Sequence, residues 1–234
     1  FKHTSANGMG ADVIHINNDG LAHLIEMHMH PADNYRRKVL MSGYNYRNYQ
    51  NNELFGYQYQ YVRNTLQLNQ GPRMRSNDTI GEPIFSDVGF YAGIASTDWS
   101  WAPVVQDFDN DGLRDMIVTN GFPKDITDHD FIAFREKSFI RLSKREMLKA
   151  IPEVKIKNYA FRNNGNVQFA NVTNDWGFTE LSFSNAAAYA DLDNDGRLDL
   201  VDSQIGVEAV VLKNNADGTN FLSVAFKGND GNTK

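Results

Sequence analysis

Two short acidic loops of the same pattern constrain this chain most strongly. Residues 107–115 place aspartates at the first, third, fifth and ninth positions and Gly112 at the sixth, and residues 191–199 repeat the pattern with Gly196. Carboxylates at alternate positions of a tight loop can all face one point, and the glycine permits the sharp turn. Hard oxygen ligands in this number favour Ca²⁺.

We therefore predict two calcium sites, with Ca²⁺ as the cofactor of this chain. Positions one, three, five and nine would supply side-chain oxygens, and position seven would supply a backbone carbonyl. A pair of acidic β-turns with no ion is the alternative, although the repetition of the pattern favours a metal. The expected ligands are Asp107, Asp109, Asp111, Leu113 and Asp115 in one loop and Asp191, Asp193, Asp195, Arg197 and Asp199 in the other.

The same pattern opens an EF-hand, so that type of site must be compared. An EF-hand needs a helix on each side of the loop and a bidentate glutamate at position twelve. Position twelve is Val118 in the loop that starts at Asp107 and Asp202 in the loop that starts at Asp191. Pro103 and a β-branched run flank the loop of residues 107–115, and these residues favour strands. We therefore predict strand–loop–strand calcium sites.

A degenerate third copy of the loop spans residues 15–23. It has His15 and His23 at positions one and nine, and Asn17 and Asp19 are its weak candidate metal ligands. Histidine suits softer metals better than calcium. The loop either keeps only its turn or belongs to a transition-metal site. The histidines that leave the second possibility open are His15, His23, His28 and His30.

Charge and composition exclude several classes of function. The formal net charge is −6, and the two acidic loops carry eight of the 29 acidic residues, so no basic surface for nucleic acid is expected. The chain has no cysteine, which excludes zinc–thiolate sites, disulfides and thiol catalysis. No apolar run is long enough to form a transmembrane segment. The chain starts at Phe1 without a visible signal peptide, and we expect it to be part of a longer protein.

Strand and turn signals recur around the acidic loops. The turn Asn163-Asn-Gly165 follows a strand-like run, as Asn69-Gln-Gly71 does. A repeated unit of about four short strands cannot bury both of its faces alone, and such units stacked radially form a β-propeller. We predict an all-β fold, a partial β-propeller with inserted helical segments. The expected segments are 1–30 (a degenerate calcium-loop blade segment), 31–63 (a tyrosine-rich insertion), 64–121 (a blade with a calcium loop), 122–157 (a helical insertion), 158–217 (a second blade with a calcium loop) and 218–234 (the start of another domain).

The two insertions differ in composition. The first contains a candidate short helix over 33–41, a further tyrosine at Tyr44 and the alternating run Tyr57-Gln-Tyr59-Gln-Tyr61, whose rings would share one face of a strand. Such a row can bind a sugar or a partner, but more often it packs an insertion onto its domain. In the second insertion we predict one helix over 131–149, with a basic face that is more often solvated than bound to lipid.

These features resemble FG-GAP/VCBS repeats, the blades of integrin-α-type propellers. The tail from Asn220 to Gly228 is similar to the opening of an ASPIC/UnbV domain. The resemblance covers nearly the whole chain, and the degenerate loop of residues 15–23 departs from it through its two histidines. The order of motifs is most similar to the bacterial cartilage acidic protein-like family, through the runs Asp33-Asn-Tyr-Arg-Arg-Lys38, Asn64-Thr-Leu-Gln-Leu-Asn69, Thr97-Asp-Trp-Ser-Trp-Ala-Pro103 and Asp107-Phe-Asp-Asn-Asp-Gly112.

The resemblance implies a calcium-bound propeller that is extracellular or exposed at the cell surface, in bacteria often lipid-anchored at the outer membrane through an upstream segment. We expect a non-enzymatic binding module whose partners are other envelope or surface proteins, with glycan as a further candidate ligand. The alternative is a glycan-binding or glycan-processing propeller enzyme, but no nucleophile–base pair with suitable spacing is visible. A concave pocket in which tyrosine and acidic groups converge would favour that alternative.

Overall fold

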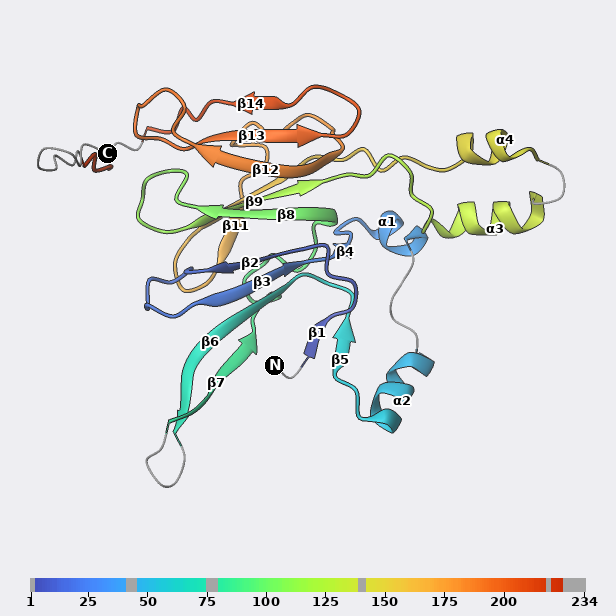
Figure 1. Ribbon diagram of the computed structural model, residues 1–234, viewed down its shortest axis with the longest axis horizontal. Coiled ribbons are helices and arrows are strands. Elements are labelled where there is room, and N and C mark those ends of the chain that lie inside the picture. Colours follow the sequence, from blue (N-terminus) through green and yellow to red (C-terminus); the bar gives the residue numbers. More distant parts are fainter. Residues whose placement is uncertain (1–2, 41–45, 75–79, 139–141, 218–219, 225–234) are drawn as a thin grey trace, which may run out of the picture.

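The protein is mostly β-structure, and the predicted all-β, partial propeller fold is confirmed. The computed structural model describes residues 3–40, 46–74, 80–138, 142–217 and 220–224. Three antiparallel sheets are arranged like a fan, and each sheet follows the order of the chain (Figure 1). Sheets of successive antiparallel strands, placed side by side around a common centre, are the blades of a propeller.

The strands group into three blade-like sheets and one separate pair. The first sheet contains β2 (Gly10–Ile14), β3 (His23–Met27), β6 (Thr65–Met74) and β7 (Ile80–Asp87). The second contains β8 (Asp98–Gln106), β9 (Asp115–Asn120), β10 (Tyr159–Asn163) and β11 (Phe169–Asn171), with the short β4 (Met29–His30) at the edge of β8. The third contains β12 (Ser184–Ala190), β13 (Asp199–Gln204) and β14 (Val210–Leu212), and the parallel pair is β1 (His3–Ser5) with β5 (Tyr59–Tyr61).

The sheets divide the chain differently from the repeat units expected from the sequence. Strands β6 and β7 pair with β2 and β3, whereas β8 and β9 pair with β10 and β11, so the segment 64–121 belongs to two sheets. Apart from the short β4 at the edge of the second sheet, each sheet instead begins with the strand before an Asp-rich or degenerate loop. A repeated pattern has the same period from any starting point, so only the strand pairing defines where a blade starts.

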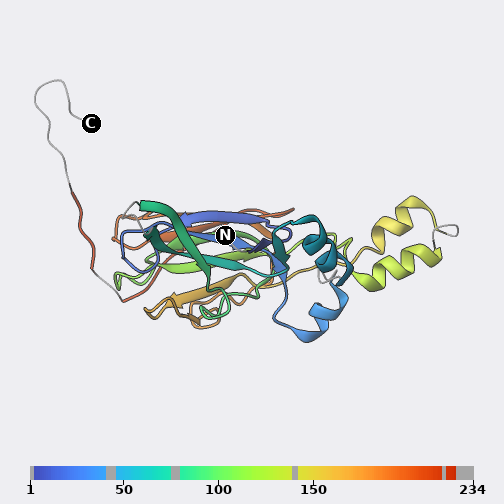
Figure 2. The same cartoon turned by 90° about the horizontal axis from the view of Figure 1, so that it is seen from below.

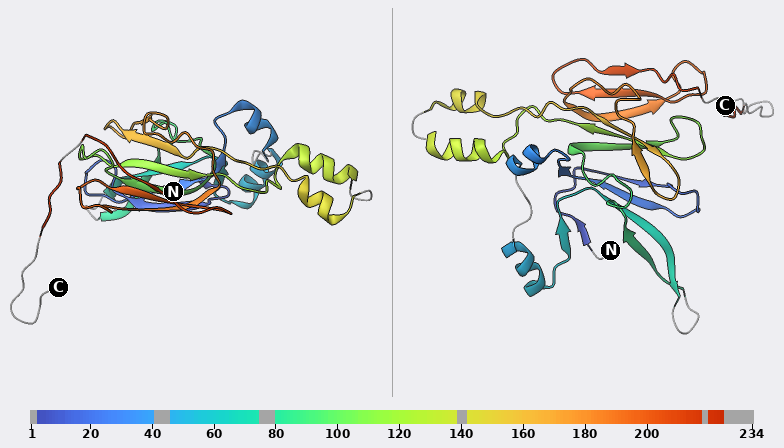
Figure 3. Two further views of the ribbon diagram at one scale, coloured as in Figure 1. Left: turned by 90° about the horizontal axis from the view of Figure 1, so that it is seen from above. Right: turned by 180° about the vertical axis from the view of Figure 1, so that it is seen from behind.

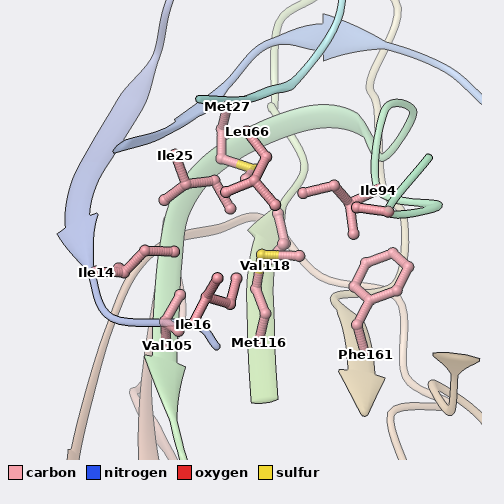
Figure 4. Close-up of a cluster of buried hydrophobic side chains, with 11 residues drawn as sticks. Ile14, Ile16, Ile25, Met27, Leu66, Ile94, Val105, Met116, Val118 and Phe161 are labelled. Atoms are coloured by element: carbon pink, nitrogen blue, oxygen red, sulfur yellow. The ribbon is translucent and has the colours of Figure 1, made fainter. Parts of the chain in front are cut away.

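A hydrophobic core fills the space between the first and second sheets. Strands β2, β3 and β6 supply side chains from one side, and β8, β9 and β10 supply them from the other (Figure 4). A second cluster, built around Val104, Phe108, Ile117, Ala160 and Leu200, joins the second sheet to the third. Burial of apolar side chains on both sides of the second sheet holds the blades together.

The first strands of neighbouring sheets approach each other very closely. A Cβ atom added at Gly10 on β2 would lie 1.8 Å from the carbonyl oxygen of Trp101 on β8. No side chain fits at that distance, so glycine is required where the two backbones meet.

The first insertion forms two helices, α1 (Asn34–Val39) and α2 (Tyr46–Phe55). The short helix expected over 33–41 is present, and the Asp33 side chain caps it by accepting a bond from the Arg36 amide. The rings of Tyr49, Tyr59 and Tyr61 stack on one another, with centroids 5.2 and 6.4 Å apart.

The expected row of three tyrosines on one strand is shorter than predicted. Strand β5 begins at Tyr59, and Tyr57 lies before it against Phe55, with ring centroids 6.0 Å apart. Tyr44 lies outside the described residues.

The second insertion contains two helices, so the prediction of one helix over 131–149 is wrong. Helix α3 spans His129–Ser138 and α4 spans Lys144–Lys149. Ser143 and Glu146 form a capping box, which starts a new helix at α4. The two helices extend beyond the end of the sheets (Figures 2 and 3). Among the described residues, no helix has the length and apolar character needed to cross a bilayer.

Arg36 ties both insertions to the second sheet. Its guanidinium donates to both carboxylate oxygens of Asp98 at 3.2 and 3.0 Å, and to Asp125 at 3.3 Å. Asp98 opens β8 with φ of 64°, and Asp125 is fully buried. The planar fork of the guanidinium lets one side chain pair with both buried carboxylates, which compensates their removal from water.

Candidate functional site

The two acidic loops and the degenerate loop occupy equivalent places in the three sheets. Each joins the first two strands of its sheet: β2 to β3, β8 to β9, and β12 to β13. All three lie at the same end of the sheets, at the left in Figure 1, and helices α1, α3 and α4 lie at the other end. The predicted strand–loop–strand setting is therefore present, and no EF-hand helix flanks the loops.

In the loop of residues 107–115, three carboxylates converge. Asp107, Asp109 and Asp115 each place an oxygen within 4.8 Å of the others. Asp115 is fully buried, so one charge of the cluster is held away from water. Three carboxylate oxygens at these separations can bind one cation between them.

Backbone amides of the same loop fix the aspartates in place. Asp107 accepts bonds from the amides of Asp111 at 3.1 Å and Gly112 at 2.9 Å, and Asp111 accepts one from Leu113 at 2.8 Å. Asn110 and Gly112 have φ of 56° and 90°. Asparagine and glycine are the residues that adopt this left-handed conformation most readily. The residue types of the motif thus build the turn as well as the charge.

The charges of this loop favour a cation. Burial raises the pKa of Asp115 to about 7, and the neighbouring Asp109 adds to the shift, although the amides of Asn163 and Phe108 oppose it. Burial and Asp111 also raise the pKa of Asp109. A divalent ion between these carboxylates would remove the repulsion and stabilise their ionised forms. The donor set therefore fits a calcium ion.

The loop of residues 191–199 brings together a slightly different set. Asp191, Asp193 and Asp195 place oxygens within 4.8 Å of one another. Asp191 accepts bonds from the amides of Asp195 at 3.0 Å and Gly196 at 2.9 Å, as Asp107 does in its own loop.

Two basic side chains face the carboxylates of residues 191–199, which form the third loop along the chain after residues 15–23 and 107–115. The Lys213 ammonium pairs with Asp193 and lies 3.5 Å from Asp195, and the Arg197 guanidinium also pairs with Asp195. Burial opposes the ionisation of Asp195, but the Arg197 amide and these two cations lower its pKa. An ion bound here has to compete with the Lys213 ammonium.

Not every predicted ligand lies in a converging group. Asp111 is not in the first group, and Asp199 is not in the second. The buried Asp199 instead accepts bonds from the amides of Leu192 at 3.2 Å and Asn214 at 2.8 Å. Leu113 and Arg197 stand at the seventh position, where a backbone carbonyl would be the ligand. In the degenerate loop, Asn17 and Asp19 bond to each other at 2.8 Å.

Each loop has one asparagine that holds the side chain at its ninth position, and the sequence analysis did not assign these three asparagines to the site. The amides of Asn69, Asn163 and Asn214 donate to His23 Nδ1, Asp115 Oδ1 and Asp199 Oδ1 at 3.0, 2.9 and 2.8 Å. Their side-chain amides donate to the carbonyls of the eighth residues, at 3.2, 3.0 and 3.2 Å. The signal in the sequence is an asparagine within, at the end of or just after the third strand of each sheet, followed two residues later by a residue whose amide bonds to its side chain. Its role had to be found from the strand pairing.

Side chains also link neighbouring loops to each other. The Asn18 amide donates to the Gly112 carbonyl at 3.0 Å, and the equivalent Asn110 amide donates to the Gly196 carbonyl at 3.2 Å. Arg114 donates to the His15 carbonyl at 3.0 Å. The three loops therefore form one connected layer at this end of the sheets.

A pocket of about 390 Å³, lined by both polar and apolar side chains, lies near the opposite end of the second sheet. Tyr159 lines it beside the Arg36–Asp98 pair, and burial together with the charges of Asp98 and Asp33 raises the pKa of Tyr159. Lys157 donates to the Asn174 side chain at 3.0 Å. The polar and charged groups at its wall include Asp33, Arg36, Asp98, Lys157, Tyr159 and Asn174.

Comparison with known proteins agrees with the repeat architecture. Residues 155–201 match the family model of an FG-GAP-like repeat. The matched stretch contains β10, β11, β12 and the whole loop from Asp191 to Asp199. No curated protein matches the chain. The chain thus contains an FG-GAP-like repeat that runs from the last two strands of its second sheet into the first strand and loop of its third, and its sheets have the form of propeller blades.

Proposed function

We propose that this chain is a calcium-stabilised β-propeller module that binds other proteins outside the cell or at its surface. The convergence of Asp107, Asp109 and Asp115, with Asp115 fully buried, supports the calcium ion most directly. The ion would link the two strands β8 and β9 at the end of their hairpin. Because an ion that binds only the folded state stabilises it by mass action, each site would add about 4 kcal/mol at a thousandfold excess over its Kd.

An extracellular location fits both the expected ion and the FG-GAP-like repeat. Oxygen cages of modest affinity, with Kd values of about 10⁻⁴–10⁻³ M, are typical of extracellular calcium modules. The resemblance to the cartilage acidic protein-like family suggests an envelope assembly, with a bacterial outer membrane as its site and other envelope proteins as partners. The module would be non-enzymatic, since the acidic residues of both loops serve to hold the ion and the turn.

Calorimetric titration of the 234-residue chain with CaCl₂ tests the calcium proposal. We expect two bound ions, and Asp109→Asn and Asp193→Asn should each remove one of them. Asp130→Asn, on the exposed side of α3 at the other end of the molecule, is the matched control and should leave both ions in place. Absence of calcium binding by the unmodified chain would overturn the proposal.

Glycan binding is a second candidate function, and the cavity beside Tyr159 favours it. Its volume of about 390 Å³ lies within the usual range of about 300–1,000 Å³ for small-molecule sites. Tyrosine, acidic, basic and amide side chains converge at its wall, and such groups can exchange hydrogen bonds with sugar hydroxyls.

A glycan array followed by titration of each hit tests this candidate. Binding that is weakened at least tenfold by Tyr159→Phe or Lys157→Met, but not by Tyr57→Phe, would support it, because Tyr57 is exposed and does not line the cavity. Equal weakening by the Tyr57→Phe control would place the glycan elsewhere, and no hits at all would leave protein binding as the function of the module.

A further inference from the structure

We propose that the first loop, residues 15–23, is closed by two imidazole N–H groups in the place of a metal ion. The loop keeps the shape of the two acidic loops: Asn18 and Gly20 have φ of 57° and 81°, close to the values at the same positions of the others. Asp19 accepts a bond from the Leu21 amide at 2.7 Å, as the fifth residue does in each acidic loop. The turn therefore forms with one carboxylate instead of four.

His23 takes the place of the ninth aspartate. It is 1% exposed, and its Nδ1 lies 3.0 Å from the backbone amide of Asn69. Because an amide can only donate, Nδ1 is the acceptor and carries no proton. The proton of the neutral ring is then on Nε2, which lies 2.9 Å from Oδ1 of Asn17 and 3.6 Å from Asp19.

His15 completes the closure from the first position. Its Nδ1 lies 3.0 Å from the carbonyl oxygen of Leu21, which is the seventh residue of the loop. A carbonyl can only accept, so Nδ1 of His15 is the protonated nitrogen. In a calcium loop the third side chain and the seventh carbonyl would both bind the ion. Here Asn17 and Leu21 each accept a bond from an imidazole instead.

The same arrangement disfavours a transition metal in this loop. A metal binds a ring nitrogen through a lone pair. In His23, Nδ1 faces the Asn69 amide and Nε2 carries the proton, so neither nitrogen offers a lone pair to an ion. His28 and His30 are engaged elsewhere, with the Asn7 amide and the Ser96 hydroxyl. The four histidines that suggested a metal centre therefore do not converge among the described residues.

The metal-independent loop supports the acidic loop beside it. Asn18 donates to the Gly112 carbonyl, and Arg114 donates to the His15 carbonyl, at 3.0 Å in both cases. The first loop thus offers a fixed surface to the second whether or not an ion is bound there. The comparison with calcium rests on the proposed function, but the proton positions on the two histidines do not.

Nitrogen-15 NMR of the unmodified chain tests the proton positions directly. Long-range ¹H–¹⁵N spectra at pH 7.5 should show His23 as the neutral Nε2–H form and His15 with its proton on Nδ1. During a CaCl₂ titration, the amide signals of Gly112 and Gly196 should shift, while that of Gly20 stays within the small shift expected from its contact with the second loop. Titration with ZnCl₂ should leave both ring nitrogens of His23 unchanged, because neither of them offers a lone pair.

Two double variants test the idea by gain of function. His15→Asp/His23→Asp restores the acidic pattern and should bind one calcium ion more than the unmodified chain in calorimetric titration. His15→Asn/His23→Asn is the matched control, since it removes the same rings without adding charge, and it should gain no ion. Far-UV circular dichroism of all three proteins establishes that each one is folded.

These outcomes distinguish the proposed calcium binding by the two acidic loops from the inference that the first loop closes without a metal. If Gly112 and Gly196 do not respond to calcium, the proposed function fails while the histidine protons can still be read. If they respond and Gly20 or the His23 ring responds equally to calcium or zinc, the first loop binds metal and the inference is overturned. An Nδ1–H proton on His23 would overturn it as well.

Discussion

The side-chain amide of Asn163 on β10 donates to the carbonyl of Ile16 in the first loop at 3.0 Å, across the boundary between two sheets. The same amide also donates to the Arg114 carbonyl at 3.0 Å, within its own sheet. The equivalent Asn214 repeats the arrangement one sheet further on, where it donates to Phe108 and Leu198. In the second and third sheets, one asparagine therefore joins its own loop to the preceding one.

We expect Asn163→Ala to lower the free energy of unfolding markedly. Asn163 is 1% exposed, so its removal leaves the carbonyls of Ile16 and Arg114 without their donor in a buried place. Each buried unsatisfied group costs about 1–3 kcal/mol. Urea denaturation should show the loss, and Asn164→Ala at the exposed neighbouring position should change stability far less. Equal effects of the two substitutions would refute a linking role for Asn163.

A second prediction concerns communication between loops. Asn18→Gly should weaken calcium binding by residues 107–115 about two- to tenfold, because the variant loses one hydrogen bond, worth about 0.5–1.5 kcal/mol, to the Gly112 carbonyl. Glycine tolerates the φ of 57° at this position.

The matched control is Asn194→Gly. Asn194 has φ of 60° at the same position of the third loop, and among the described residues its amide donates to no other loop. Calorimetry on both variants measures the difference. A weaker calcium site with Asn194→Gly and an unchanged one with Asn18→Gly would contradict the coupling.

Lys213 should compete with calcium in the third loop. Its ammonium pairs with Asp193 and lies 3.5 Å from Asp195, so Lys213→Met should tighten calcium binding by that loop. The effect should be several-fold at low ionic strength and should shrink at high salt, since the lysine is 54% exposed and salt screens exposed charges.

Lys124→Met is the control for net charge. Lys124 is similarly exposed but pairs with Glu153 in the second insertion, away from the loops. If both substitutions tighten calcium binding equally, the effect comes from the overall charge of the protein and not from competition within the loop.

Buried His28 should make the fold sensitive to acid. Burial lowers the pKa of His28 to about 4, from 6.5 as the ordinary value, and the ring is fully buried. Between these two values the unfolded chain binds more protons than the folded one, so stability falls as the pH falls from about 6.5 to 4.

His28→Gln tests this contribution, because glutamine can still accept a bond from the Asn7 amide, as Nε2 does at 2.9 Å. Thermal melts of both proteins should differ in slope between pH 6.5 and 4.5, with the variant losing less stability on acidification. Parallel slopes would show that His28 does not contribute.

The sequence was sufficient for the loops and their setting, because local rules govern them. The Asp-x-Asp-x-Asp-Gly pattern predicts the turn, and Pro103 with the β-branched runs predicts strands on both sides, as observed. The short helix expected over 33–41 follows local rules too, and Asp33 caps it in the structure. An FG-GAP-like repeat at 155–201 agrees with the resemblance read from the motifs, whereas the more specific family stays a prediction.

What the sequence left open depends on contacts between distant residues. The pairing of β6 and β7 with β2 and β3 is set by the tertiary fold, and nothing local distinguishes it from pairing with β8. The contact between Asn163 and Ile16 joins residues 147 positions apart. The proton position on His23 follows only from its contact with the amide of Asn69, 46 residues further along the chain. The predicted start of an ASPIC/UnbV domain lies mostly outside the described residues.

Thermal unfolding of the chain with and without calcium, combined with a count of bound metal, tests the central claim most directly. We predict about two calcium ions per chain and a melting temperature that falls by at least about 10 °C when a chelator removes them. The Asp109→Asn/Asp193→Asn variant should melt at the lower temperature in both conditions. A chain that binds no calcium and melts at the same temperature with and without the chelator would contradict the claim that these two loops are calcium sites.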